Sequence, residues 1–312
     1  HMFAFVFPGQ GSQSVGMLND LADLKIVQDT VTEASDALGL DLLKMMKEGP
    51  IEDLNLTVNT QPVMLTASIA AYRAWLDMGG QVPAIVAGHS LGEYSALTAA
   101  GVFSLTDAVK LVRVRAQAMQ NAVPVGVGGM AAILGIDDAS VLAVCAQAQK
   151  EIAGEVVQAV NFNSPGQVVI AGHKAAVEKA CELAKAAGAK RALVLPVSAP
   201  FHSSLLASAA DVLAEALVAV EMRSPQMPVI NNVDVKIETS LPNIRDALVR
   251  QAWHPVRWVE CVTAIADTGV SDVVECGPGK VLAGLAKRID PRLTGHALVD
   301  QASLKSILAT LN

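Results

Sequence analysis

The sequence has 312 residues, of which 52% are hydrophobic, 17% charged and only 4% aromatic, and its formal net charge is −7. A chain of this length can bury a sizeable aliphatic core and fits one large domain with a smaller one inserted. The acidic balance argues against a nucleic-acid-binding protein, which needs a basic excess on one face. Long uncharged stretches such as residues 122–136 are interrupted by proline and glycine, so no membrane span is predicted.

The cysteines predict neither a metal site nor a disulfide framework. Cys145, Cys181, Cys261 and Cys276 lack the paired spacing of zinc ligands, and few histidines lie near them. We therefore expect four reduced cysteines in the core. No secretory signal opens the chain, so the expected compartment is the cytoplasm.

The N-terminal third of the chain alternates between strand and helix patterns. The apolar run 3–7 ends in the glycine-rich stretch 8–13, which predicts a buried strand that leads into a tight loop. A helical pattern covers residues 60–78, and a second apolar run at 83–88 leads into the helical pattern 93–100. This alternation predicts an α/β fold.

The middle of the chain predicts a separate small unit with the β-α-β-β-α-β order of a ferredoxin-like fold. Its predicted strands are 130–136, 156–162, 167–171 and 191–197, and its predicted helices are 139–150 and 175–187. Because such a unit closes on itself, we expect residues 128–198 to form an inserted small subdomain. Residues 1–127 and 199–312 would then form the large subdomain.

The large subdomain is predicted to resume with a helix at residues 205–220. Two further strands of a mainly parallel sheet are expected at 229–235 and 270–275. The glycine-rich segment 277–280 then turns the second of these strands into a helix. It is not a Walker motif, because valine replaces the metal-binding Ser or Thr.

A Gly-x-Ser-x-Gly motif follows the second predicted strand. The segment Gly88-His89-Ser90-Leu91-Gly92 lies between a predicted strand and a predicted helix, as in a nucleophile elbow, where flanking glycines relieve crowding at a sharp turn. Ser90 is therefore the candidate nucleophile. His89 should point away from it and form a hydrogen bond within the elbow.

A serine hydroxyl needs a base to accept its proton, usually a histidine later in the chain. The candidates are His173, His202, His254 and His296. His202 is favoured because it follows the strand pattern 191–197 in a polar turn, and active sites of open α/β sheets collect at the carboxyl ends of strands. No acidic residue between the serine and the histidine is a convincing third member of a triad. Its absence favours transfer to a thiol over activation of water.

The helix that follows Ser104 places an arginine on its buried face. Ser104 and Asp107 form a capping signature, and Arg115 shares a stripe with apolar residues further along the same helix. A buried guanidinium needs a partner, and its planar fork suits a carboxylate. Two interpretations stay open: Arg115 holds an acidic substrate, or it forms a structural ion pair with an internal Asp or Glu.

An acyl-transfer site also needs N–H donors for the oxyanion of its tetrahedral intermediate. The N–H of Leu91, which follows the candidate nucleophile, is one predicted donor. The segment Gly9-Gln10-Gly11 could supply the second donor, or it could be a phosphate-binding loop, although it lacks the Walker lysine spacing.

Taken together, these motifs resemble the malonyl-CoA:acyl carrier protein transacylases, an acyltransferase family of fatty-acid and polyketide synthesis. They occur in the family's order over nearly the whole chain, which implies an α/β-hydrolase-like large subdomain, a ferredoxin-like small one, and a cleft between them that holds Ser90. The matching segments are Phe7-Pro8-Gly9-Gln10-Gly11-Ser12-Gln13, Gly88-His89-Ser90-Leu91-Gly92-Glu93, Val160-Asn161-Phe162-Asn163-Ser164-Pro165-Gly166-Gln167, Pro200-Phe201-His202-Ser203 and Glu275-Cys276-Gly277-Pro278-Gly279.

The resemblance implies a role for each candidate in the chemistry. Ser90 is the implied nucleophile and His202 the implied base. The N–H groups of Gln10 and Leu91 are the implied oxyanion donors. The resemblance also implies that the backbone carbonyl of Gln251 orients the histidine in place of an acid, which explains the missing triad carboxylate.

Four residues are implied to contact the substrate. Arg115 holds the malonyl carboxylate, while His89 and Asn161 are further implied substrate-binding residues. Phe201, before the histidine, is typical of malonyl-selective acyltransferase domains, and its ring should crowd an α-methyl group. We therefore predict a preference for malonyl over methylmalonyl groups, of the modest size that one methyl allows.

The implied reaction transfers malonyl from malonyl-CoA to the phosphopantetheine thiol of acyl carrier protein through a malonyl-serine, in a ping-pong mechanism without metal or redox cofactor. The expected protein is a monomer whose partners are malonyl-CoA and acyl carrier protein, with no nucleic acid and no membrane. An acidic carrier would need a local basic patch. The candidates for that patch are Lys185, Lys190, Arg191, Lys280, Lys287 and Arg288.

Three alternatives share some of these features. A discrete acyltransferase that serves a polyketide synthase would use the same chemistry with another carrier. A serine esterase or thioesterase would share the elbow but should lack the Arg115 clamp. A non-catalytic binding module would require Ser90 and His202 to be idle.

Overall fold

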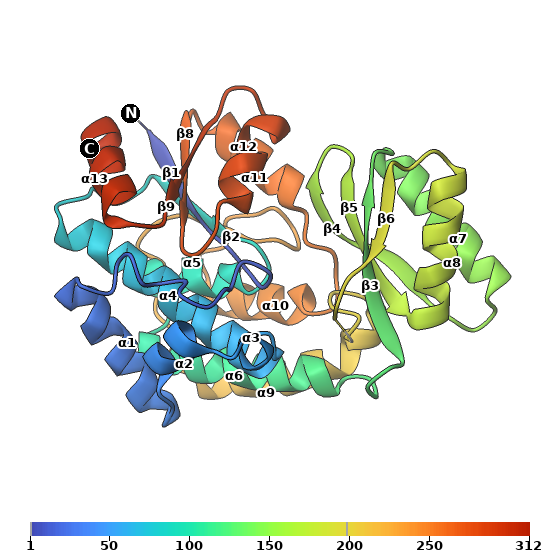
Figure 1. Cartoon of the computed structure of the whole chain (residues 1–312), viewed down its shortest axis with the longest axis horizontal. Coiled ribbons are helices and arrows are strands. Elements are labelled where there is room, and N and C mark those ends of the chain that lie inside the picture. The colour runs from blue at the N-terminus through green and yellow to red at the C-terminus, as the bar shows by residue number, and fades with distance from the viewer. Residues whose placement is uncertain (1, 198) are drawn as a thin grey trace.

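The computed structural model describes residues 2–197 and 199–312, which form two subdomains side by side (Figure 1). The large subdomain contains a parallel sheet with the strand order β7-β2-β1-β8-β9. Every residue of β1, β2 and β8 is buried, as expected for parallel strands with both faces covered. The strands are β1 (Phe3–Phe7), β2 (Ile85–Gly88), β7 (Val229–Ile230), β8 (Asp272–Cys276) and β9 (Thr294–Leu298).

Helices cover both faces of this sheet and make it the middle of three layers. One face packs against a large cluster of helices and the other against a smaller cluster, so the two apolar cores are separated by the sheet. The larger group comprises α1 (Lys25–Leu38), α2 (Leu42–Glu48), α3 (Ile51–Leu54), α4 (Thr57–Asp77), α5 (Gly92–Ala99), α6 (Leu105–Asn121), α9 (Ala207–Ala219), α10 (Leu241–Gln251) and α13 (Gln301–Leu311). The smaller group is α11 (Trp258–Asp267) and α12 (Val281–Ile289).

The small subdomain has the predicted ferredoxin-like architecture. Its antiparallel sheet has the order β4-β5-β3-β6, and α7 and α8 pack on one face of it. The opposite face packs against the ends of α6 and α9 of the large subdomain. The elements are β3 (Gly128–Leu134), α7 (Asp138–Glu151), β4 (Val157–Ser164), β5 (Gln167–His173), α8 (Lys174–Ala186) and β6 (Arg191–Val194). Ser198, the predicted last residue of this unit, lies outside the described residues.

Main-chain hydrogen bonds join the two subdomains at the edge strand β4. The N–H of Val256 donates to the carbonyl of Val160 at 2.7 Å, and the N–H of Phe162 donates to the carbonyl of Val256 at 3.0 Å. The large subdomain therefore adds a short parallel segment to the small sheet. This seam fixes the position of β4 relative to the parallel sheet, whose strand β2 leads into the turn with Ser90.

Several predicted elements differ in extent, and the strand expected at 191–197 ends at Val194. The strand expected at 229–235 ends at Ile230, because the side-chain oxygen of Asn231 accepts hydrogen bonds from the N–H groups of Asp234 and Lys236 and closes a turn. The helix expected at 205–220 opens with a 3-10 turn at Ser204–Leu206 before α9 begins. None of the described helices is both long and apolar enough to cross a bilayer.

Candidate active site

The turn between β2 and α5 has the geometry of a nucleophile elbow. Ser90 adopts a φ of 55°, a conformation that costs energy for a residue with a side chain. A Cβ on Gly88 would lie 1.8 Å from the carbonyl oxygen of Gly92, and one on Gly92 would lie 2.1 Å from the carbonyl oxygen of Phe7. Both flanking positions must therefore be glycine for the strand, the turn and the helix to pack this closely.

The hydroxyl of Ser90 meets the predicted histidine. Ser90 Oγ lies 2.6 Å from His202 Nε2, and His202 Nδ1 lies 2.7 Å from the carbonyl oxygen of Gln251. Because a carbonyl oxygen can only accept, Nδ1 carries the proton and Nε2 is left to accept the serine proton. Burial, and then the positive charge of Arg115, lower the pKa of His202 to about 3, so the imidazole is neutral near pH 7.

The other candidate histidines have partners away from Ser90. His173 Nδ1 accepts from the N–H of Val156 at 2.8 Å, and His254 Nδ1 lies 2.7 Å from the carbonyl oxygen of Arg250. His296 Nε2 lies 2.8 Å from a carboxylate oxygen of Asp272. Among the four histidines considered, the structure brings His202 to the serine.

Arg115 lies beneath the elbow, fully buried on α6 as the sequence predicted. Its Nη1 donates to Gln61 Oε1 at 2.8 Å, and its Nη2 donates to Gln251 Oε1 at 3.0 Å and lies 3.4 Å from Ser90 Oγ. The guanidinium also lies 5.2 Å from the centre of the Tyr94 ring. Burial lowers the pKa of Arg115, and the negative charges of Tyr94 and Glu93, when ionised, oppose this shift.

No carboxylate within the described part of the chain forms a salt bridge with Arg115. The ion-pair interpretation from the sequence is therefore not what the structure contains. A buried cation that is bound only through neutral oxygens lacks a counter-charge, which makes its surroundings favourable for an anionic ligand.

The glycine-rich loop after β1 lies against the elbow. A Cβ on Gly9 would lie 2.6 Å from the carbonyl oxygen of His89 and 3.7 Å from the N–H nitrogen of Leu91, so only glycine permits this approach. Among the hydrogen bonds of the described residues, the N–H groups of Gln10 and Leu91 have no acceptor. The loop continues into turns, and a helix begins only at Lys25, so it does not open a helix as a phosphate-binding loop does.

Two side chains that were not predicted from the sequence hold the main chain of the elbow, those of Asn232 and Gln251. Asn232 Oδ1 accepts from the N–H of Ser90 at 2.8 Å, and its Nδ2 donates to the carbonyl of Gly88 at 2.7 Å. The side chain of Gln251 adds a bond from Nε2 to the carbonyl of Ser90 at 2.9 Å. Asn232 lies inside the strand predicted at 229–235, so no signal in the sequence marked it as a residue of the site.

Glu93, which ends the elbow motif, supports this arrangement from a fully enclosed position. Its Oε1 accepts from the N–H of Asn232 at 2.8 Å and lies 3.5 Å from Gln251 Nε2. Burial raises the pKa of Glu93 to about 7. Glu93 thus acts on Ser90 through Asn232.

The remaining predicted residues surround the elbow from the small subdomain and the following turn. His89 Nε2 lies 2.7 Å from Asn163 Oδ1 of β4, so its partner is in the small subdomain and not in the elbow as predicted. The side-chain oxygen of Asn161 is buried and has no hydrogen-bond partner within the described residues. Phe201 is 8% exposed and belongs to the apolar cluster between the subdomains, which also includes Val160.

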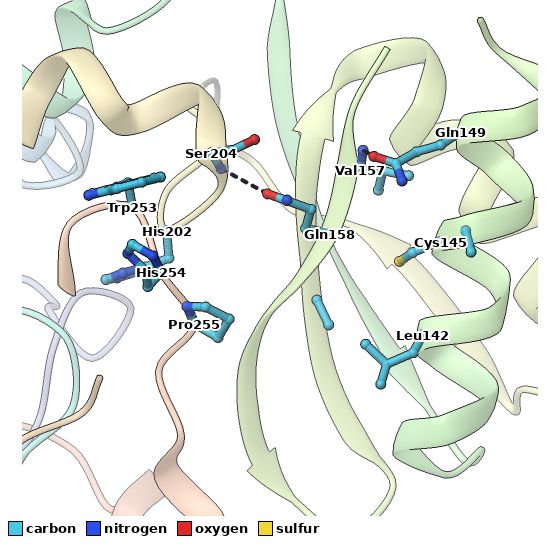
Figure 2. Close-up of a pocket in the computed structure, with 12 residues that line it drawn as sticks. Leu142, Cys145, Gln149, Val157, Gln158, His202, Ser204, Trp253, His254 and Pro255 are labelled. Carbon is cyan, nitrogen blue, oxygen red and sulfur yellow. Dashed lines mark hydrogen bonds between the residues drawn. The ribbon is translucent and has the colours of Figure 1, made fainter. Parts of the chain in front are cut away.

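A cavity of about 380 Å³ follows the seam next to the histidine. Figure 2 shows His202, Trp253, His254 and Pro255 on one side of it, with β4 and α7 on the other. Gln158 of β4 accepts a hydrogen bond from the N–H of Ser204 across this seam at 2.8 Å. No cluster of three or more potential metal ligands occurs among the described residues.

This combination of a serine on an elbow, a neutral histidine and a buried arginine defines an acyltransferase site, and the comparisons agree with it. The Acyl transferase domain model matches residues 4–289, so the chain belongs to this acyltransferase family. It is 57% identical over 307 residues to the malonyl CoA-acyl carrier protein transacylase of Salmonella typhimurium, and the match covers 98% of each chain.

Solved structures give the same relationship. The acyl-carrier-protein S-malonyltransferase of Burkholderia pseudomallei is 64% identical, with a TM-score of 0.97 over 99% of this chain and 100% of the other. A malonyl-transacylase solved in complex with its type II PKS acyl-carrier protein is 53% identical, with a TM-score of 0.97 over 99% of this chain and 100% of the other. The predicted two-subdomain fold is thereby confirmed.

Proposed function

We propose that this protein transfers the malonyl group of malonyl-CoA to the phosphopantetheine thiol of an acyl carrier protein through a malonyl ester of Ser90. The observation that carries the proposal is the position of the Arg115 guanidinium, buried without a carboxylate partner and 3.4 Å from Ser90 Oγ. Malonyl has its carboxylate one methylene from the carbonyl that reacts. A clamp for that carboxylate must therefore lie beside the nucleophile, as Arg115 does.

In the first half-reaction, Ser90 Oγ attacks the thioester carbonyl and His202 Nε2 accepts the hydroxyl proton. The N–H groups of Gln10 and Leu91 donate to the oxyanion of the tetrahedral intermediate. The C–S bond then breaks, and His202 returns the proton to the CoA sulfur. In the second half-reaction the carrier thiol gives its proton to His202, and its thiolate attacks the ester carbonyl. Breaking the C–O bond returns the proton to Ser90.

The histidine environment suits transfer between thiols. A backbone carbonyl orients His202 without adding negative charge, and the positive Arg115 lies close by. The imidazolium that forms is therefore less stabilised than in a triad with a carboxylate, so His202 is a weak base. A thiol, which ionises far more easily than water, is the acceptor that a weak base can activate.

Selectivity and domain limits are further parts of this proposal. Phe201 would disfavour an α-methyl group on the malonyl unit, by an amount typical of a single methyl. His89 and Asn161 would contact the thioester substrate from the elbow and from β4.

Residues 128–198 would be the inserted subdomain, and residues 1–127 and 199–312 the large one.

The carrier is proposed to dock on basic residues that the two subdomains expose. The six predicted basic residues are all exposed, and none forms an ion pair with another described residue. A Cβ on Gly279 would lie 3.0 Å from Ser12, which places Lys280 beside the glycine-rich loop. A Cβ on Gly135 would lie 2.8 Å from the side chain of Lys190 in the small subdomain. A fatty-acid carrier is the first candidate, and the relative solved with its type II PKS acyl-carrier protein supports a polyketide carrier as the second.

The test is to mix the protein with malonyl-CoA and follow its intact mass. We expect a malonyl adduct that disappears when holo acyl carrier protein is added and reappears on the carrier. Ser90→Ala should form no adduct. An adduct on the Ser90→Ala protein, or release of free malonate instead of transfer to the carrier, would contradict the proposed function.

A further inference from the structure

A chain of hydrogen bonds connects Arg115 to the glycine-rich loop. Arg115 Nη1 donates to Gln61 Oε1 at 2.8 Å, and Gln61 Nε2 donates to Thr57 Oγ1 at 3.2 Å. Thr57 Oγ1 then donates to Gln10 Oε1 at 2.6 Å. Gln61 and Thr57 lie one turn apart on α4, so the helix holds both links in a fixed relation.

The direction of every bond in this chain is determined by its first member. Arg115 can only donate, so the oxygen of the Gln61 amide must face it and the NH₂ group must face Thr57. The Thr57 hydroxyl accepts there, and its single proton is left for the carbonyl oxygen of Gln10. Bonds aligned in one direction from a buried cation polarise and strengthen one another.

The loop has few other restraints on Gln10. Gln10 is exposed, and it is flanked by Gly9 and by Gly11, whose φ is 109°. Gly11 has no side chain to restrain the backbone, so the loop after Gln10 can adopt a wide range of angles. A second bond, from the N–H of Gly11 to Gln13 Oε1 at 2.7 Å, holds the next residue of the loop but not the side chain of Gln10.

We propose that Thr57 is a positioning residue, which holds Gln10 so that its main-chain N–H points at the oxyanion. Thr57 itself is 7% exposed and touches neither Ser90 nor Arg115 through a hydrogen bond. This inference rests on the proposed function, because it requires an oxyanion beside Ser90. It predicts that the loop is held by a chain of side chains that begins at Arg115.

The test compares Thr57→Val with Thr66→Val in the full-length protein. Thr66 is also buried on α4, but its hydroxyl donates to the carbonyl of Pro62 in the same helix at 2.7 Å. The initial rate of acyl-enzyme formation is measured with malonyl-CoA and with acetyl-CoA. We expect Thr57→Val to lower kcat about tenfold for both substrates, with KM for malonyl-CoA unchanged, because it weakens a group used only in the transition state.

The control Thr66→Val should keep kcat within about twofold, and Thr57→Ser, which retains the hydroxyl, should recover most of the lost rate. Three results would overturn the inference: an unchanged kcat in Thr57→Val, a rise in KM for malonyl-CoA alone, or an equal loss in Thr66→Val. If the unmodified protein forms no acyl-enzyme, the proposed function fails instead, so the two failures are distinguishable.

Discussion

The two sides of Ser90 differ in how completely their hydrogen bonds are satisfied. On the histidine side, each polar atom has a defined partner, from Ser90 Oγ through His202 to the carbonyl of Gln251. On the arginine side, a buried guanidinium is bound through neutral oxygens, and no carboxylate among the described residues forms a salt bridge with it. The first side is complete within the protein itself, whereas in the proposed function the malonyl carboxylate would complete the second.

This difference suggests separate roles for the two sides: the serine–histidine pair carries out the acyl transfer, and the arginine selects the acyl group. A complete serine–histidine pair can react with any acyl thioester that reaches it, because it contacts only the reacting atoms. An uncompensated buried cation favours one acyl group, the one that brings a negative charge to it. Changes on the histidine side should therefore affect all acyl groups equally, and changes on the arginine side should depend on the acyl group.

The largest effect should come from removing the cation. Arg115→Ala should lower kcat/KM for malonyl-CoA by roughly 10²- to 10³-fold, the usual loss for truncating one member of a buried charge pair. The rate with acetyl-CoA should change far less, because acetyl has no carboxylate. Steady-state kinetics with the two substrates check this.

Arg113→Ala is the matched control for this substitution. Arg113 lies on the same helix but is only half-buried, and it should leave both rates within about twofold. Equal losses for malonyl-CoA and acetyl-CoA in Arg115→Ala would show that the arginine stabilises the elbow and does not select the malonyl group.

The sequence predicted the histidine side better than the arginine side for a physical reason. The elbow depends on local geometry, in which Gly88 and Gly92 leave room at a turn between a strand and a helix, so a short motif describes it. Arg115 was placed on a buried face by helical periodicity alone. Its neighbours Gln61 and Gln251 come from distant segments, so periodicity could not distinguish a substrate clamp from an ion pair.

The parts that the sequence did not predict depend on long-range pairing. Asn232 holds Ser90 only because the strand predicted at 229–235 stops after Ile230, and the turn that stops it depends on one side chain, Asn231. His89 binds Asn163 because β4 is docked on the large subdomain. The prediction for His89 used only the alternation of side chains along one strand, which cannot show a partner in another subdomain.

A smaller effect should appear in the pH dependence of the histidine side. Because the pKa of His202 is lowered to about 3, kcat/KM for both substrates at pH 5.5 should lie within about twofold of its value at pH 7.5. A histidine with an ordinary pKa near 6.5 would lose about tenfold over that range. A pH–rate profile with an acid limb near pH 6.5 would show that His202 is not the neutral buried base of the structure.

The same shift has a consequence for stability. In the unfolded chain His202 binds a proton below about pH 6.5, whereas in the folded protein it does so only near pH 3. Its contribution to the free energy of unfolding is complete above about pH 6.5 and is lost as the pH falls toward 3. Glu93, whose pKa is raised to about 7, acts in the opposite sense and loses its contribution as the pH rises through 7. The free energies of unfolding of the protein and of His202→Gln, measured with urea, should therefore become more similar as the pH is lowered below 6.5.

A separate effect, confined to the second half-reaction, should come from the carrier surface, which lies outside both sides of Ser90. Reversing the exposed charges in Lys287→Glu and Arg288→Glu should leave the malonyl-CoA half-reaction unchanged. Transfer to the carrier should slow about three- to tenfold at low salt and less at high salt, because exposed charges act mainly on association and are screened. Lys110→Glu, an equal charge change at an exposed position of α6, is the control and should leave transfer to the carrier unaffected. If Lys287→Glu slows both half-reactions alike, α12 contributes to the acyl site itself. Lys287 would then not be a residue that acts only in carrier binding.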